Sequence, residues 1–565
     1  EMEGRVSSLM DDVDFVTPVV NVDPQSQPGW FDVSFAFEDR EGASVSPADI
    51  QRALRKGESF VRKGDRTYLI DADAVESMND VFADCAGRDG AEAGHFLLSD
   101  IYAPFVKASL DGLDGVDVEV PRTWTQAAER QNRTLSIEKA PIPASLNDIL
   151  RPYQRQGVDW LYFLEQNGFC GLLADEMGLG KTLQTIAWLG LPRCRAEAAG
   201  RPALVVCPTS LVGNWADEIE RFAPDVKSLL MSGSDRHENW ENVGDADVLI
   251  TSYALLRRDS DRYAEHTFSA AILDEAQHIK NRATQNARAA KRINALHRLV
   301  LTGTPMENSV SDLWSIMDFL MPGYLGAHDT FRMNYELPLS REDSDKEKIQ
   351  RKLRRKLQPF MMRRLKTDVA ADLPPKIERV SRCPLSPDQK AVYAELLAAS
   401  RRRISSMVSK KGFNRSRMEI LTTLLRLRQA SCHLDLLKLD GLEAKEPSAK
   451  LEAFFELVDE AIDGGHRVLV FSQFVSMLKI IRGELDSRRI GYCYLDGTTQ
   501  DRTEQVRRFN TDRRIPIFLI SLKAGGTGLN LTGADMVIHF DPWWNPAVEN
   551  QATDRAHRIG QKRTV

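Results

Sequence analysis

A glycine-rich segment in the first half of the chain has the residue types that bind phosphate. Its letters are DEMGLGKT, it follows an apolar run, and it precedes a helical pattern from Leu183 to Leu189. Glycines in such a turn let backbone N–H groups point at phosphate oxygens, at the positive end of a helix. The lysine is expected to reach the β- and γ-phosphates of a nucleotide, and the threonine hydroxyl to hold Mg²⁺. The expected nucleotide contacts are Asp175, in place of the usual first glycine, with Gly178, Gly180, Lys181 and Thr182.

Two adjacent carboxylates, Asp274 and Glu275, end a second apolar run that begins at Ala271. The first can hold the Mg²⁺ shell, and the second can orient or deprotonate an attacking water. Separately, these segments could be a chance GKT and a surface Asp-Glu pair. Together on one sheet they predict an ATP-hydrolysing enzyme. Gln154 lies just upstream, and its amide offers a donor and an acceptor suited to an adenine edge.

A third segment, Gln551 to Gln561, has two arginines three residues apart, Arg555 and Arg558. Residues at that spacing share one face of a helix. Phosphoryl transfer develops negative charge, and an arginine that reaches it is worth on the order of 10³–10⁵ in rate. In isolation the pair would be interpreted as surface arginines. Beside a complete nucleotide site, it predicts a catalytic finger, with Gln551 as a further nucleotide contact.

The alternation of short apolar runs with helical patterns predicts an α/β protein. Several domains are expected, because 565 residues are too many for one hydrophobic core. Buried parallel strands are expected where short apolar runs alternate with helical patterns, at 171–174, 203–207, 248–251, 271–273, 299–302, 468–471, 517–521 and 536–540. We expect a small α+β accessory domain at 1–140, a first α/β lobe at 141–370 with a helical protrusion from about 311, a helical linker at 371–450 and a second lobe at 451–565.

The accessory domain has its own local signals. Alternation from Phe31 to Phe37 predicts a strand, and Ser46-Pro47 predicts a helix start. A hairpin is expected around Lys63-Gly64-Asp65, with helices near 74–82 and 101–110. Nothing in this part of the sequence indicates a specific chemistry.

Composition excludes several classes of protein. A hydrophobic fraction of 42% and a charged fraction of 28% are ordinary for soluble globular chains. No apolar stretch of about 18 residues is present, so no membrane span is expected. The acidic start is unlike a signal peptide, and seven cysteines without a CxxC spacing predict neither a disulfide framework nor a zinc ribbon. A reducing compartment is therefore expected.

The net charge of −6 argues mildly against a nucleic-acid binder. Local charge decides where phosphates dock, however, and two basic stretches stand out, Arg351 to Lys366 and Arg401 to Arg417. Each is either a solvated helix face or a phosphate-docking surface. The sequence leaves both interpretations open.

Several motifs in order closely resemble the SWI/SNF-like ATPases of helicase superfamily 2, over roughly residues 145–565. They are residues 175–182, 274–277 (DEAQ), 301–305 (LTGTP), 358–366 (QPFMMRRLK), 521–531 (SLKAGGTGLNL), 541–546 (DPWWNP) and 551–561. The resemblance implies two RecA-like P-loop lobes with helical protrusions. It also implies DNA-stimulated ATP hydrolysis, with Mg²⁺, that drives translocation on double-stranded DNA and remodels protein–DNA complexes.

The resemblance also implies residue roles. Thr302 would belong to the segment that couples hydrolysis to lobe movement and touches DNA. Backbone-gripping contacts are expected at Pro208, Thr209, Ser210, Lys523, Gly526, Thr527, Trp544 and Asn545. Hydroxyls, amides and a lysine suit phosphates, and such contacts fix position without reading sequence.

The departures and alternatives are specific. The helix at 427–434 lacks the family's Asn-His-Pro ending, and a last strand of the second lobe is expected beyond Val565.

The region around Trp30 faintly resembles bacterial members, which implies a cytoplasmic, nucleoid-associated protein; a eukaryotic source would imply the nucleus. A strand-separating DNA or RNA helicase and a nucleotide-dependent DNA-binding switch are the alternatives to a duplex translocase. A DNA-bound protein is a further possible partner, and the oligomeric state is open.

Overall fold

A computed structural model describes residues 13–565 except 26–28, 40–42, 65, 84, 86–94, 112, 114–115, 132–136, 193–199, 234, 304–309, 342–344, 371–372, 440–443 and 526–527. The chain forms two compact units. The first holds the described residues up to Ala174, together with Gln184–Cys207 and Ile219–Arg363. The second holds Asp175–Leu183, Pro208–Glu218 and Arg364–Val565.

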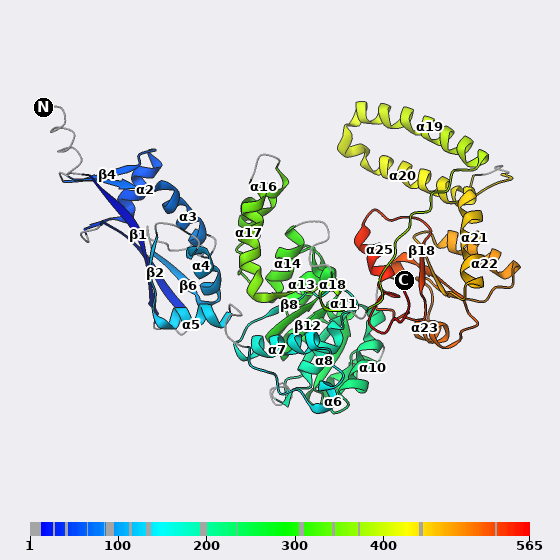
Figure 1. Ribbon diagram of the computed structural model, residues 1–565, viewed down its shortest axis with the longest axis horizontal. Coiled ribbons are helices and arrows are strands. Elements are labelled where there is room, and N and C mark those ends of the chain that lie inside the picture. Colours follow the sequence, from blue (N-terminus) through cyan, green and yellow to red (C-terminus); the bar gives the residue numbers. More distant parts are fainter. Residues whose placement is uncertain are drawn as a thin grey trace. The chain divides into compact units, whose positions relative to one another are not determined.

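The N-terminal part of the first unit is a mixed sheet with helices on one face (Figure 1). Its strands are β1 (Val13–Pro24), β2 (Trp30–Glu38), β3 (Ser44–Val45), β4 (Phe60–Lys63), β5 (Arg66–Ile70), β6 (His95–Ser99) and β7 (Asp117–Glu119). Its helices are α2 (Pro47–Arg55), α3 (Ala72–Ala83), η1 (Asp100–Tyr102), α4 (Ala103–Leu110) and α5 (Arg122–Gln131).

Side chains that are alternately buried and partly exposed along the strands explain why the helices pack on this sheet. Strand β2 buries every second side chain, including Val33 and Phe35, against the helices. Ser46 caps α2 by accepting the amide of Asp49, and β4 pairs antiparallel with β5. These predictions are confirmed. Strand β1, the longest strand of this sheet among the described residues, was not predicted.

The rest of the first unit is built on a seven-stranded parallel sheet in the order β10-β11-β9-β12-β13-β8-β14. Its strands are β8 (Gly171–Leu173), β9 (Ala203–Cys207), β10 (Ser228–Leu230), β11 (Val248–Ser252), β12 (Thr267–Asp274), β13 (Asn294–Leu301) and β14 (Met361–Met362). The five strands predicted for this lobe are confirmed. Two edge strands, β10 and β14, were missed.

The helices that accompany this sheet are α6 (Ala144–Asn147), α7 (Pro152–Gln166), η3 (Asp235–His237), η4 (Asn239–Asp245), α11 (Tyr253–Arg258), α12 (Ser260–Glu265), η5 (Ala276–Ile279), α13 (Gln285–Lys291), α14 (Val310–Leu320), α15 (His328–Phe331), η6 (Arg332–Glu336), α16 (Leu337–Ser340), α17 (Lys346–Leu357) and η7 (Gln358–Phe360). Helix η2 (Thr209–Leu211) belongs to the second unit, and α8 (Lys181–Leu189) and α10 (Val212–Phe222) are divided between the two units. Buried residues of α11, α13, α14 and α17 form one core with the strands.

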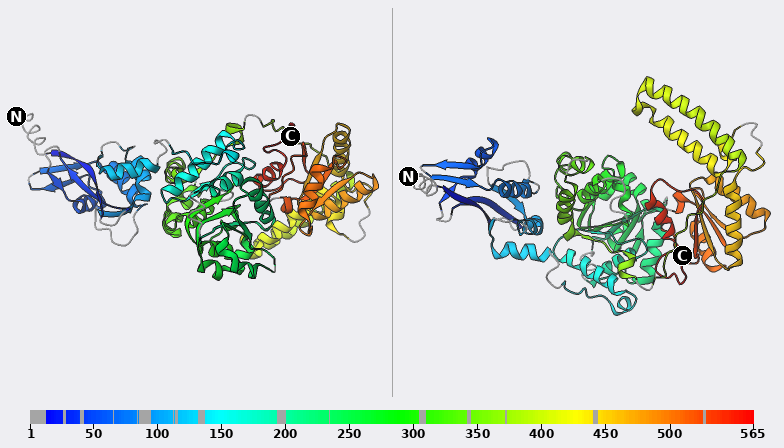
Figure 2. Two further views of the ribbon diagram at one scale, coloured as in Figure 1. Left: turned by 90° about the horizontal axis from the view of Figure 1, so that it is seen from below. Right: turned by 45° about the horizontal axis from the view of Figure 1, so that its top comes forward.

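The second unit contains a smaller parallel sheet in the order β16-β17-β15-β18. Its strands are β15 (Val468–Ser472), β16 (Tyr492–Leu495), β17 (Ile517–Ser521) and β18 (Met536–His539). Its helices are α18 (Lys366–Val369), α19 (Pro387–Lys411), α20 (Phe413–Cys432), η8 (Leu434–Leu437), α21 (Ala449–Asp463), α22 (Val475–Ser487), α23 (Arg502–Thr511), α24 (Leu522–Gly525) and α25 (Pro546–Thr553). Helices α19 and α20 run side by side as a hairpin (Figure 2).

The fold class is as predicted: two α/β parts with parallel sheets and helical insertions, preceded by an α+β region. Three of the second sheet's strands were predicted, and β16 was missed. None of the helices in the described part of the chain is long and apolar enough to cross a bilayer.

Candidate active site

The glycine-rich loop connects β8 to α8, as the sequence predicts. Gly178 and Gly180 both have left-handed backbone angles, with φ of +85° and +78°. A Cβ on Gly178 would lie 2.8 Å from the Cβ of Arg558 and 3.3 Å from its Cα. Position 178 therefore requires glycine for two reasons: its left-handed conformation and the close approach of the arginine. Lys181 begins α8, and its Nζ donates to the Asp175 carbonyl at 2.8 Å.

Asp175, which stands where a first glycine is usual, is fully buried and pairs with Arg364. The guanidinium donates through Nε at 2.9 Å to one carboxylate oxygen and through Nη2 to the other. The backbone continues the contact, because the Glu176 amide donates to the Arg364 carbonyl at 3.0 Å. A two-pronged, buried pair of this kind fixes both partners in orientation. The aspartate therefore anchors the loop to the segment that follows β14.

Lys366 joins the same loop to the end of α25. Its backbone amide donates to the Glu176 carboxylate at 2.7 Å. Its Nζ donates to Asp554 Oδ1 at 2.6 Å and to the His557 carbonyl at 2.7 Å. Burial raises the pKa of Asp554, and the positive charge of Lys366 offsets part of that rise. Both groups are largely withdrawn from water, with side-chain exposures of 6% and 12%.

The two predicted finger arginines lie just after α25, in the turns that follow it. The prediction that they share one face of a helix is therefore wrong, because the helix ends at Thr553. Arg558 donates through Nη1 to the Leu529 carbonyl at 3.3 Å, and burial lowers its pKa, partly countered by Glu218 and Asp554. Arg555 is also buried, and its carbonyl accepts the Leu531 amide at 3.0 Å. Of the two, Arg558 is the one whose backbone lies against Gly178. Sequence alone could not rank them.

The predicted carboxylates end strand β12 in the first unit, and both are buried. Glu275 has φ +52° and ψ +55°, a left-handed conformation that is uncommon for a residue with a Cβ. Its amide donates to Asp274 Oδ1 at 2.9 Å, and its Oε2 accepts Gln277 Nε2 at 3.0 Å. Such backbone strain costs of order 1–3 kcal/mol and clusters at functional sites.

A buried tyrosine contacts the backbone at these carboxylates. The Tyr253 hydroxyl donates to the Asp274 carbonyl at 2.8 Å. Burial raises the pKa of Tyr253 well above its usual range, and the charges of Asp274 and Glu275 add to that rise. Strands β8 and β12 both flank β13 and run parallel to it. The carboxyl end of β8, which leads into the glycine-rich loop, and the carboxyl end of β12 therefore lie at the same edge of this sheet.

Two other predicted residues have clear structural contacts. Gln154 is buried in the first turn of α7, where its Oε1 accepts the Arg151 amide at 3.0 Å. This contact caps the helix and fixes the orientation of the amide group. Thr302 is buried at the end of β13, and its amide donates to the Leu173 carbonyl at 3.2 Å. Its place links the segment after β13 to the strand that leads into the glycine-rich loop.

The segments predicted to grip DNA meet in the second unit. Pro208 caps the short helix η2, which holds Thr209 and Ser210. A Cβ on Gly528, which has φ +63°, would lie 1.7 Å from Leu211 Cδ2, so η2 packs directly on the segment after α24. Lys523 lies within α24. Gly526 and Thr527 lie outside the described residues.

Trp544 and Asn545 precede α25 and differ in exposure and contacts. The Trp544 side chain is 65% exposed, and the Arg428 guanidinium lies 4.8 Å from the centre of its ring. Asn545 caps α25 by accepting the Ala547 amide at 3.0 Å. Helix capping therefore accounts for the asparagine, while most of the indole lies on the surface. Gln551 lies within α25 itself.

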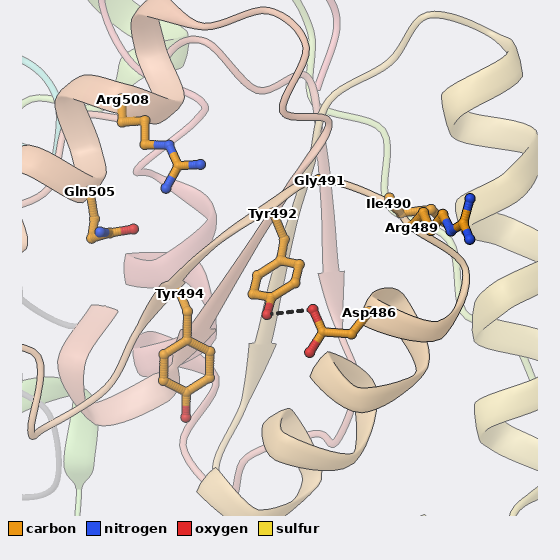
Figure 3. Close-up of a pocket in the computed structure, with 8 residues that line it drawn as sticks. All are labelled: Asp486, Arg489, Ile490, Gly491, Tyr492, Tyr494, Gln505 and Arg508. Carbon is orange, nitrogen blue, oxygen red and sulfur yellow. Dashed lines mark hydrogen bonds between the residues drawn. The ribbon is translucent and has the colours of Figure 1, made fainter.

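A hollow of about 430 Å³ opens elsewhere on the second unit and involves none of the predicted residues. It is lined by Asp486, Arg489, Ile490, Gly491, Tyr492, Tyr494, Gln505 and Arg508. Figure 3 shows Tyr492 donating to Asp486, at 2.9 Å, with Arg508 and Gln505 approaching from α23. Tyr492 begins β16, so this hollow lies toward the amino edge of its sheet, whereas Lys523 follows the carboxyl end of β17.

Comparison with known proteins identifies the family. Residues 153–436 match the SNF2-related domain, and residues 449–560 match the helicase conserved C-terminal domain. The chain belongs to the SNF2-related family. YwqA of Bacillus subtilis, whose name describes an ATP-dependent helicase/translocase, is 35% identical over 553 residues, covering 93% of this chain and 58% of that protein.

Other relatives span bacteria, archaea and eukaryotes. ISW1 of Saccharomyces cerevisiae, an ISWI chromatin-remodeling complex ATPase, is 37% identical over 75% of this chain and 38% of its own length. The SWI2/SNF2 ATPase core of Sulfolobus solfataricus in complex with duplex DNA is 37% identical, covering 76% of this chain and 88% of that one, with a TM-score of 0.41. The chain thus spans about two fifths to three fifths of these curated relatives. The family prediction is confirmed.

The residues that hold the loop to α25 were not predicted. Arg364 and Lys366 lie in a basic stretch whose sequence left two interpretations open, packing and function. Asp554 lies inside the finger motif without a role assigned to it. A signal was present, because both stretches match family motifs. The pairing itself joins residues 188 positions apart and is not written in local sequence.

Proposed function

We propose that this chain hydrolyses ATP and uses the energy to move along double-stranded DNA. The observation that carries the proposal is the contact of Arg558 with Gly178, held by Lys366 and Asp554. A phosphate-binding loop with a buried arginine at its side has the two positive groups that phosphoryl transfer uses. Family membership supports the same reaction.

In this proposal, the glycine-rich loop and the α8 amino end bind the phosphates, and Lys181 moves from the Asp175 carbonyl to the β- and γ-phosphates. Gln154 contacts the adenine edge, and Gln551 is a further nucleotide contact. The hydroxyl of Thr182 and the carboxylate of Asp274 are hard oxygen donors, a set that fits Mg²⁺. The metal supplies charge neutralisation at the phosphates. Glu275, oriented by Gln277, receives the proton of the attacking water.

Arg558 stabilises the charge that develops on the transferred phosphoryl group, and Arg555 supports it. Burial makes the charged form of Arg558 unfavourable, so an anion bound at the loop lowers the free energy of the site. Lys366 and Asp554 position the arginine by fixing the end of α25. The same contacts would transmit a change at the nucleotide to the second sheet.

For DNA, we propose that Pro208 to Ser210 and the segment Lys523 to Asn530, with Gly526 and Thr527, contact the backbone. Leu211 packs against Gly528, which brings these two segments together. Exposed Trp544 and its neighbour Asn545 are further proposed contacts, and Thr302 is proposed to belong to the coupling segment. Backbone contacts predict little preference among duplex sequences.

The object moved is inferred to be a protein bound to DNA. Relatives include a chromatin-remodeling ATPase and the TATA-binding protein-associated factor MOT1, 35% identical over 75% of this chain. The bacterial relatives favour a nucleoid-associated protein of the cytoplasm.

The test is a steady-state ATPase rate measured with duplex DNA, single-stranded DNA and RNA of equal nucleotide content. We expect strong stimulation by the duplex alone. Glu275→Gln is the matched control, because it is nearly isosteric and leaves Lys181 intact. Its turnover should fall at least about 10²-fold while ATP binding persists.

Each other outcome points to a different function. Stimulation by single-stranded DNA or RNA would favour a strand-separating helicase. ATP binding without turnover in the wild type would favour a nucleotide-dependent switch. Unchanged turnover in Glu275→Gln would mean that this carboxylate is not the base.

A further inference from the structure

Helix α17 is the most basic described helix of the first unit. Its residues KEKIQRKLRRKL include seven lysines or arginines and a single glutamate. The buried positions Leu353, Lys356 and Leu357 share one side of the helix. Four exposed cations gather toward the opposite side, which we call the basic stripe: Lys348, Arg351, Arg354 and Arg355. The helix therefore separates apolar contact from charge.

The buried side is firmly anchored to its surroundings. Lys356 is only 1% exposed, and its Nζ lies 5.3 Å from the centre of the Phe105 ring and 5.8 Å from those of Tyr102 and Tyr324. The Tyr324 hydroxyl donates to the Lys356 carbonyl at 2.8 Å. Tyr102 in turn donates to the Tyr324 carbonyl at 3.2 Å. These aromatic contacts fix the rotation of α17 about its axis, and thereby the direction of the basic stripe.

The basic stripe itself is not neutralised by the described residues. None of its four side chains forms an ion pair with a described carboxylate. Other exposed arginines are paired, such as Arg52 with Asp49 and Arg292 with Asp261. Four uncompensated cations on a helix held in one orientation repel each other, which costs free energy unless an anion binds. In a chain with net charge −6 this concentration points to a polyanionic ligand.

We propose that the basic stripe binds the phosphate backbone of duplex DNA, as a contact additional to those of Pro208–Ser210 and Lys523–Asn530. Lys348 to Arg355 spans about 10 Å along the helix axis. Over that length duplex DNA carries about six phosphate charges. The density of positive charge along the basic stripe is therefore comparable to the density of negative charge along the duplex. The inference rests on the proposed function, because both take duplex DNA as the ligand.

The test is the salt dependence of duplex binding by the triple variant Lys348→Gln/Arg351→Gln/Arg355→Gln. These side chains are exposed, and glutamine keeps a similar helix propensity, so folding should be unaffected. The matched control is Arg52→Gln/Arg292→Gln/Arg507→Gln. It removes the same charge from side chains that are 53–72% exposed and already paired with Asp49, Asp261 and Glu504.

Affinity for a short labelled duplex is measured between about 50 and 200 mM salt, where each phosphate contact contributes about 0.9 to the log–log slope. The slope of the triple variant should be shallower than that of the wild type by about 2 to 3. The control should match the wild type. A triple variant with the wild-type slope would overturn this inference alone. A wild type that does not bind duplex would overturn the proposed function and the inference with it.

Discussion

Replacing Lys366 by methionine should release the end of α25 from the glycine-rich loop. The lysine amine donates to Asp554 at 2.6 Å and to the His557 carbonyl at 2.7 Å, with only 6% of its side chain exposed. Methionine has a similar length and no charge. The change therefore leaves the Asp554 carboxylate buried without its cation.

The expected cost follows from that burial. Removing one partner of a buried ion pair costs about 3–5 kcal/mol. At about 1.4 kcal/mol per factor of ten, local opening of α25 should become from about 10² to several times 10³ times more frequent. By contrast, Lys107 and Glu129 form a partly exposed pair at 3.6 Å, and surface pairs are worth about 0–1 kcal/mol. Lys107→Met is therefore the matched control.

The assay is amide hydrogen exchange over residues 546–558, which reports local opening. Lys366→Met/Asp554→Asn should recover much of the protection, since it removes the orphaned charge as well. The pH dependence has a definite sign. Burial already raises the pKa of Asp554, and loss of the lysine raises it further. A pKa above the unfolded value makes stability fall as pH rises through it, so the single variant should regain protection as pH is lowered. Exchange no faster than in Lys107→Met would refute the reasoning.

Two further changes test the loop and the finger. Arg558→Ala should abolish duplex-stimulated ATPase and leave ATP and duplex binding largely intact, and lysine should rescue it poorly because it lacks the planar fork; lost duplex binding with unchanged basal turnover would make this arginine a DNA contact instead. Gly178→Ala should weaken ATP binding, measured by titration, because its Cβ would press on Arg558 in a left-handed backbone. Gly323→Ala has a similar φ of +84° with nothing within 4 Å, so equal effects of both variants on ATP binding would contradict that explanation.

In the parallel sheets, the clearest strands in the sequence are those buried on both faces. Strands β9 and β11 are buried at every position, so they appear as unbroken apolar runs. Strand β16 has alternating, half-buried tyrosines and lies at the sheet edge, which gives a weak pattern. Strand β14 has two residues inside a basic stretch. These two missed strands depend on their neighbours in space for their assignment.

The site divides in the same way. Local spacing predicts Gly178, Lys181 and the Asp274-Glu275 pair, because one loop or one strand end contains the whole signal. The left-handed backbone of Glu275 and the pairing of Lys366 with Asp554 are tertiary facts. No window of sequence contains both partners, so the positioning of the finger could not be predicted.

The central claim is movement along intact duplex DNA, and displacement of a third strand from a DNA triplex tests it most directly. A labelled triplex-forming strand is placed in the path of the protein, and its release is followed with ATP. We expect ATP-dependent release by the wild type, no release by Glu275→Gln, and an underlying duplex that stays paired. An intact triplex despite rapid ATP hydrolysis, or separation of the two duplex strands, would contradict it.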